Sequence, residues 1–161
     1  MNADAFRHFY NYHFGINRYL WESCVLPLSQ EQFIQDVDYS VGSVRNQIVH
    51  LMSVDNVWFC DLRGVENPGY FDPNDFEDRS ALRAQWDQVE QAMREYLASL
   101  RDDMLFEKPL EGEDENLILW QVLLHVVNHG TDHRAQLLRI LKDLGVETFP
   151  QDYIFYVYDH P

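Results

Sequence analysis

Residues 81–100 read ALRAQWDQVEQAMREYLASL, and their apolar side chains recur in steps of three and four. Because an α-helix has about 3.6 residues per turn, this spacing places the apolar side chains on one face. The segment therefore predicts an amphipathic helix with one face buried in a core. The apolar positions are Leu82, Trp86, Val89, Met93, Tyr96 or Leu97, and Leu100.

Two earlier segments show the same helical spacing. We expect a helix over about residues 4–26, which ends before Pro27 because proline cannot continue a helix. The sequence SQEQ at residues 29–32 is typical of a capping box. Another helix is expected between Ser43, a candidate N-cap, and Gly64, a residue type that commonly ends helices.

The last part of the chain predicts a further helix and a tail. Apolar residues at helical spacing run from Leu119 to Leu144, with Asn116 as a candidate N-cap and Gly145 as a stop. The tail, FPQDYIFYVYDHP at residues 149–161, is aromatic and β-branched. We expect a short extended segment that either covers one end of the helices or contributes to a dimer contact.

Four amphipathic helices, with no strand pattern before residue 150, predict an all-α protein with the architecture of a four-helix bundle. A chain of 161 residues is long enough to bury a sizeable core. We therefore expect residues 1–161 to form one bundle domain followed by the short aromatic tail.

The composition excludes some classes of partner. The formal net charge is −15, and no basic patch that could bind a phosphate backbone stands out, so no nucleic-acid partner is expected. No signal peptide and no apolar run of about 20 residues is present, so we expect no membrane partner and a cytoplasmic protein. Cys24 and Cys60 form no CxxC pair and are expected to be small buried side chains.

Three of the seven histidines lie in the stretch HVVNHGTDHRAQ, residues 125–136. His125, His129 and His133 follow one another at intervals of four, so neighbours lie one turn apart on one helix face. The first and the last are about 12 Å apart along the axis, too far to share one ion. The spacing therefore allows a metal-binding pair made of 125 and 129, or of 129 and 133.

A third metal ligand has to come from another helix. His50 is the best candidate, because it lies among apolar residues in QIVHLMSVDNVWF, where an imidazole needs a polar partner. Either a metal ion or an ordinary hydrogen bond would satisfy the imidazole of His50. His8, His13 and His160 are expected to be surface or structural residues. The ExxH, HExxH, GxSxG and P-loop motifs are absent from the sequence.

Two segments resemble one known family. QVLLHVVNHGTDHRAQ, residues 121–136, is similar to the signature helix of the DinB (damage-inducible) family, and GSVRNQIVHLMSVDNVWFCDLRG, residues 42–64, resembles that family's second helix. The resemblance covers nearly the whole chain. It implies a four-helix bundle, often a homodimer, of the DinB/YfiT-like metalloenzyme superfamily. It also implies a divalent metal ion, commonly zinc or nickel, held by His50, His129 and His133.

Several further residues lie close to these ligands in the sequence. His125 is then one turn from the site, packed against it or behind the ligands. Asp132 could orient an imidazole, but it is adjacent to His133 and turned about 100° away, so solvent is expected to surround it. Asp55, Arg134 and Gln136 are candidates for the wall of a pocket, although a surface or capping position suits each of them better.

The resemblance implies a metal-dependent enzyme with a small-molecule substrate. Because superfamily members are similar to thiol-dependent S-transferases, transfer of a low-molecular-weight thiol ranks first and metal-dependent hydrolysis second. A third alternative is a non-catalytic stress-response or binding protein, in which the metal ion only joins two helices and stabilises the fold.

Overall fold

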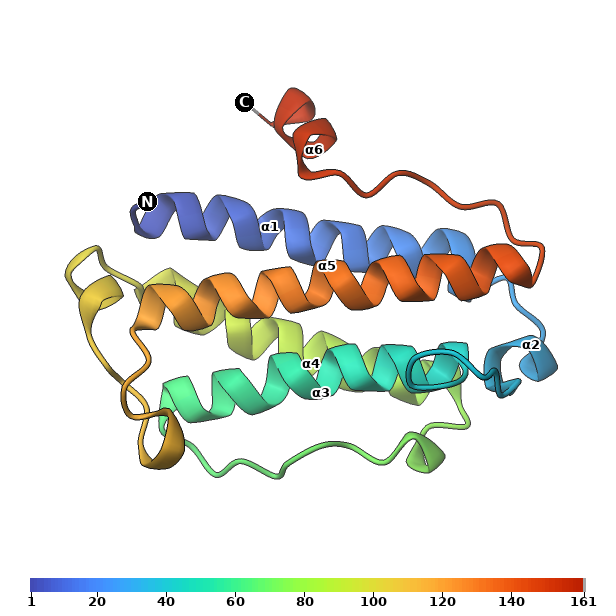
Figure 1. Ribbon diagram of the computed structural model, residues 1–161, viewed down its shortest axis with the longest axis horizontal. Helices are drawn as coiled ribbons and strands as arrows, with labels where there is room; N and C mark the ends of the chain where they lie inside the picture. Colours follow the sequence, from blue (N-terminus) through green and yellow to red (C-terminus); the bar gives the residue numbers. More distant parts are fainter. Residues whose placement is uncertain (161) are drawn as a thin grey trace.

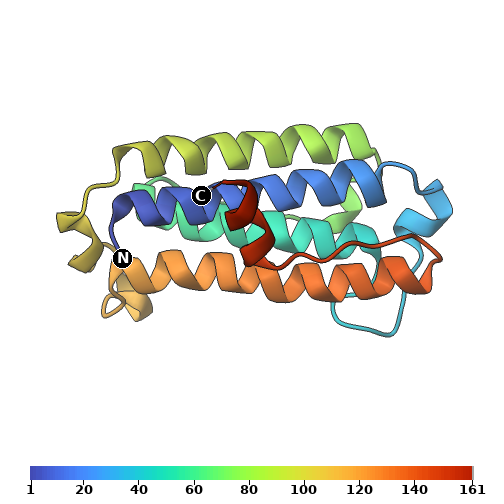
Figure 2. The same cartoon turned by 90° about the horizontal axis from the view of Figure 1, so that it is seen from above.

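The computed structural model describes residues 1–160, and this part of the chain is all-helical (Figure 1). Residues 1–160 contain six α-helices and no strand: α1 (Ala3–Leu20), α2 (Gln30–Ile34), α3 (Val44–Arg63), α4 (Arg79–Ser99), α5 (Leu119–Asp143) and α6 (Tyr153–Asp159). Short 3₁₀-helices lie in the connections, at Pro73–Asp75, Asp103–Phe106 and Gly112–Asp114. The long helices α1, α3, α4 and α5 lie side by side in both views (Figures 1 and 2).

The ends of α3 confirm the predicted boundaries. Ser43 is the N-cap, and its Oγ accepts a hydrogen bond from the Asn46 backbone N–H at 3.1 Å. Gly64 is the C-cap and has a φ of 63°, a left-handed conformation that glycine adopts without steric cost. These two ends place His50 in the second turn of α3.

The start of α5 differs from the prediction. Asn116 does not cap the helix, because its Oδ1 accepts a hydrogen bond from Lys108 Nζ at 3.1 Å instead. The N-cap is Ile118, whose backbone N–H donates to Gln121 Oε1 at 3.0 Å. A glutamine three residues into the helix thus takes over part of the capping that Asn116 was expected to provide.

The first helix continues as a π-helical turn, Trp21–Val25, directly after α1. The Leu26 backbone N–H donates to the Trp21 carbonyl at 2.8 Å, a spacing of five residues instead of four. The helical path therefore runs almost to Pro27, as predicted, and its last turn is wider than expected. This turn buries Trp21, Cys24 and Val25.

The apolar faces of the long helices meet in one core. The apolar stripe predicted for residues 81–100 is buried along α4 or directly after it: Leu82, Trp86, Val89, Met93, Leu97 and Leu100. The predicted burial of Cys24 and Cys60 is confirmed as well. Tyr10 of α1 crosses the core and donates its hydroxyl hydrogen bond to the Leu123 carbonyl of α5 at 2.9 Å.

The prediction of an extended tail at one end of the helices is wrong. Residues 153–159 form α6, which lies against the side of α1 (Figure 2). The reason is the spacing of the tyrosines: Tyr153 and Tyr156 are one turn apart and both pack edge-on against Tyr12, with ring centroids 5.2 and 5.8 Å away. Pro161, the last residue of the predicted tail, lies outside the described residues.

No helix in the described part of the chain combines the length and the apolar character that crossing a bilayer requires.

Candidate metal centre

Three histidine side chains meet where α5 packs against α3. His50 comes from α3, and His129 and His133 come from successive turns of α5. One ring nitrogen from each lies within 4.8 Å of the others. His50 Nε2 is 3.2 Å from His129 Nε2 and 3.2 Å from His133 Nε2. The structure therefore brings together the three residues that the family resemblance selected.

The spacing of these nitrogen atoms fits a single ion. Nitrogen ligands about 2.0–2.1 Å from a tetrahedral ion lie about 3.3–3.4 Å from one another. The observed 3.2 Å contacts are close to that edge length. A neutral imidazole also has only one N–H, so three converging ring nitrogens cannot all satisfy one another by hydrogen bonds. A shared cation satisfies all three lone pairs at once.

The tautomer of His133 suits this role. Its Nδ1 lies 3.3 Å from Gln47 Oε1, an oxygen that only accepts hydrogen bonds. The ring proton therefore belongs on Nδ1, which leaves the Nε2 lone pair directed toward His50 and His129. Gln47 is buried and belongs to the first turn of α3, so the helix pairing itself orients this ring.

The cluster favours neutral imidazoles. Burial, together with the neighbouring His133 and His50, lowers the pKa of His129 to about 4. Burial also lowers the pKa of His50, assisted by His133, and burial lowers the pKa of His133. Histidine binds metal ions in its neutral form, so these groups are available as ligands at neutral pH.

One side of the cluster faces outward. All three histidines are half-buried, and Tyr70, on the connection between α3 and α4, lies parallel to the His50 ring at 6.1 Å between centroids. The next residue, Phe71, anchors this connection by donating its backbone N–H to Ser53 Oγ at 3.1 Å. Tyr70 itself is 64% exposed. The three half-buried imidazoles therefore keep part of their surface in contact with solvent.

The neighbours on α5 lie outside the cluster. His125 is exposed, and its ring is 5.9 Å from that of His129 and 5.4 Å from that of Trp58. Asp132 is exposed, as expected, and its Oδ2 accepts a hydrogen bond from Gln136 Nε2 at 3.2 Å. Gln136 also pairs with the Ser40 hydroxyl, so it ties the loop before α3 to α5.

The expected surface or capping position is wrong for Asp55 and Arg134, because both side chains are buried. Asp55 Oδ2 is 3.2 Å from His13 Nε2, and the other nitrogen of this imidazole, Nδ1, is 3.1 Å from Arg134 Nη1. Since a guanidinium only donates, Nδ1 accepts and the Nε2 proton is directed at Asp55. His13, expected to be a surface or structural residue, is thus a completely buried link between the two charges.

The buried guanidinium is stable because its donors have acceptors. Arg134 Nη1 donates to Asn17 Oδ1 at 3.0 Å, Nη2 donates to Thr131 Oγ1 at 3.1 Å, and Nε donates to Gln151 Oε1 at 3.0 Å. We call His13, Asn17, Asp55 and Arg134 the buried polar network. It joins α1, α3 and α5 beside the histidine cluster. The four-residue spacing of His13 and Asn17 on the inner face of α1 was the signal in the sequence for it.

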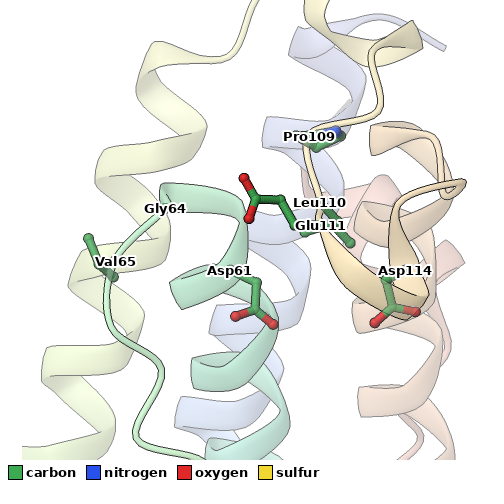
Figure 3. A pocket seen from close by; sticks show the side chains of 7 residues that line it. All are labelled: Asp61, Gly64, Val65, Pro109, Leu110, Glu111 and Asp114. Atoms are coloured by element: carbon green, nitrogen blue, oxygen red, sulfur yellow. The ribbon is translucent and has the colours of Figure 1, made fainter.

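A separate hollow of about 400 Å³ lies where α3 ends and the loop before α5 passes (Figure 3). Asp61, Glu111 and Asp114 contribute carboxylates to its lining, and no histidine is among its lining residues. It lies outside the candidate metal centre.

The fold and the cluster together define an all-helical protein with three histidines that could hold one metal ion. The model of the DinB family matches residues 1–160, and the chain belongs to the DinB family. The chain is also similar to Protein DinB of Bacillus subtilis (strain 168), at 26% identity over 98% of this chain and 96% of that protein.

Proposed function

We propose that the protein is a metal-dependent enzyme of the DinB family in which His50, His129 and His133 hold one divalent ion. The observation that carries the proposal is the convergence of three ring nitrogens, with His50 Nε2 3.2 Å from the Nε2 atoms of both His129 and His133. Zinc and nickel both suit imidazole ligands. A single four-helix bundle domain, formed by α1, α3, α4 and α5, holds the site.

The proposed reaction is transfer of a low-molecular-weight thiol to a small electrophilic substrate, with hydrolysis of a small molecule as the second candidate. A divalent ion held by three neutral ligands acts as a Lewis acid that favours the thiolate form of a thiol, or the hydroxide form of water. The chain orients its own ligands: Gln47 fixes the His133 tautomer, and Tyr70 stacks beside His50 on the open side.

The half-buried position of the cluster favours a reactive site over a purely structural one. Structural zinc sites are closed by four protein ligands, whereas catalytic sites have three and an open position. The cluster here has three histidines, and all three are only half-buried. A structural role would still make the ion bridge α3 and α5, so the two roles have to be separated by activity.

His50→Ala separates them. Both roles predict a lower melting temperature for this variant, because the ion joins α3 and α5. Only the enzyme proposal predicts that thiol consumption in the presence of a small electrophile also stops at a temperature where the variant remains folded. Turnover that is unchanged in folded, metal-depleted His50→Ala contradicts the proposal.

We also propose a homodimer. The support is the outer face of α6, where Ile154 and Phe155 are each 48% exposed and Tyr158 is 71% exposed. A short helix with this many exposed apolar side chains is stabilised when a second copy covers it.

A further inference from the structure

A second hollow lies in the groove between α3 and α5, next to the histidine cluster. Its volume is about 440 Å³, within the range of small-molecule pockets. Trp58 of α3 and Val122 and His125 of α5 form most of its wall, together with Leu117 and Gln121. The hollow is therefore lined mainly by apolar and aromatic side chains, with one amide and one imidazole.

The hollow lies one helical turn from the cluster along α5. His125, which lines the hollow, precedes the cluster residue His129 by one turn, or about 6 Å along the helix axis. The His125 ring is 5.9 Å from the His129 ring on one side and packs edge-on against Trp58, at 5.4 Å, on the other. The hollow and the cluster are therefore neighbours on α5, with the His125 ring next to both.

We infer that this hollow binds the apolar, preferably aromatic, body of the molecule whose polar head reaches the metal centre. The inference rests on the proposed function, because the head is a ligand of the proposed ion. Trp58 is the main determinant of specificity: its half-buried indole offers a large apolar surface at low entropic cost. His125, which is no part of the three-histidine cluster, is the lining residue nearest to His129 along α5.

The charge beyond the hollow restricts the ligand further. One turn after Trp58 on α3 comes Asp61, which lines the acidic hollow of Figure 3 with Glu111 and Asp114. An anionic group at the far end of the ligand would approach these carboxylates and be repelled. The part of the ligand that occupies the hollow is therefore not anionic.

The test compares two thiols that share a head and differ in their body. Isothermal titration of zinc-loaded protein with 2-phenylethanethiol and 2-mercaptoethanol measures both affinities. We expect 2-phenylethanethiol to bind about tenfold more tightly, since burial of a phenyl ring stabilises a complex by more than 1.4 kcal/mol, which is about tenfold. Trp58→Ala should remove this preference and leave the affinity for 2-mercaptoethanol unchanged.

Two further variants make the test specific. Trp120→Ala removes an exposed indole of α5 that is not among the residues lining the hollow, and it should preserve the preference. His125→Trp should fill the hollow and abolish the preference even if Trp58→Ala fails to fold. Equal affinities of the wild-type protein for the two thiols, or a preference that survives both Trp58→Ala and His125→Trp, overturns the inference while leaving the metal centre standing.

Titration of metal-stripped protein distinguishes failure of the proposed metal-dependent function from failure of the proposed binding role of the hollow. We expect removal of zinc to weaken both thiols, because both heads bind the ion. If neither affinity depends on zinc, the proposed function fails and this inference fails with it. If both affinities depend on zinc but are equal, only the inference about the hollow fails.

Discussion

Gly130 shows how a single residue allows the buried polar network to form. A Cβ at this position would lie 2.5 Å from His13 Cε1 and 3.0 Å from Arg134 Nη1. Both neighbours are fully buried and hydrogen-bonded, so neither can move freely. The absence of a side chain on α5 therefore lets the His13 ring of α1 approach the helix closely.

Gly130→Ala should lower the free energy of unfolding by about 1–3 kcal/mol, the usual cost of overpacking a core. Urea denaturation followed by circular dichroism measures it. Gly15→Ala is the matched control, because Gly15 is also helical and no atom lies within 4 Å of an added Cβ. This control should be neutral or stabilising by up to about 1 kcal/mol. Equal stability of the two variants would contradict the proposed close packing.

The histidine cluster should make the metal-free protein sensitive to acid. The pKa of His129 is lowered to about 4 in the folded chain, whereas histidine in an unfolded chain titrates near pH 6.5. A lowered folded-state pKa gives a stability contribution that is complete above about pH 6.5 and is lost as the pH falls from there toward about 4.

The melting temperature of metal-free protein should therefore fall between about pH 6.5 and pH 4. Differential scanning calorimetry at intervals of half a pH unit follows this change. His129→Asn should show a smaller fall over the same window, because it lacks the most strongly shifted group. An equal fall in melting temperature for the wild type and His129→Asn would contradict a lowered pKa of His129 in the folded protein.

At the scale of the elements, the sequence was informative wherever local periodicity decides the structure. The stripe from Leu82 to Leu100 and the ends of α3 at Ser43 and Gly64 follow from side-chain spacing and capping chemistry alone. The choice of His133 over His125 as the partner of His129 does not follow from spacing. Spacing left both pairs open, and only the packing of α3 against α5 brings His50 beside His129 and His133.

Other features were missed because they depend on contacts between distant residues. Nothing local distinguishes a buried Arg134 from a surface arginine, since its partners Asn17 and Gln151 come from opposite ends of the chain. The tail was expected to be extended because its residues are aromatic and β-branched. Contacts of Tyr153 and Tyr156 with α1 override that local preference and give α6.

His125 and His129, neighbours in the α5 run, differ in what they contact, which leads to a prediction. His129→Ala should weaken zinc binding by more than about 100-fold, because it removes one of only three ligands. His125→Ala, the matched change one turn away, should change zinc affinity less than about threefold. Competition with a chromophoric chelator measures both affinities. Comparable losses in the two variants would mean that the metal binds to a different histidine pair.

For the whole molecule, the proposed dimer gives a measurable mass. Sedimentation equilibrium should yield twice the chain mass of 19.2 kDa. Phe155→Ser combined with Tyr158→Ser, both on the exposed face of α6, should shift the equilibrium toward monomer. Replacement of the distant exposed Phe106 by serine is the control. If the wild-type protein sediments as a monomer, the dimer proposal is wrong, and the metal centre, which lies within one chain, is unaffected.

Whether His50, His129 and His133 hold one divalent ion is decided by the metal content of the protein purified without a histidine tag. Inductively coupled plasma mass spectrometry, after reloading and removal of free metal, should find about one divalent ion per chain in the wild type and less than about a tenth in His50→Ala. A wild-type protein that holds less than about a tenth of an equivalent after reloading would contradict the account. A His50→Ala variant that retains about one divalent ion per chain would also contradict it.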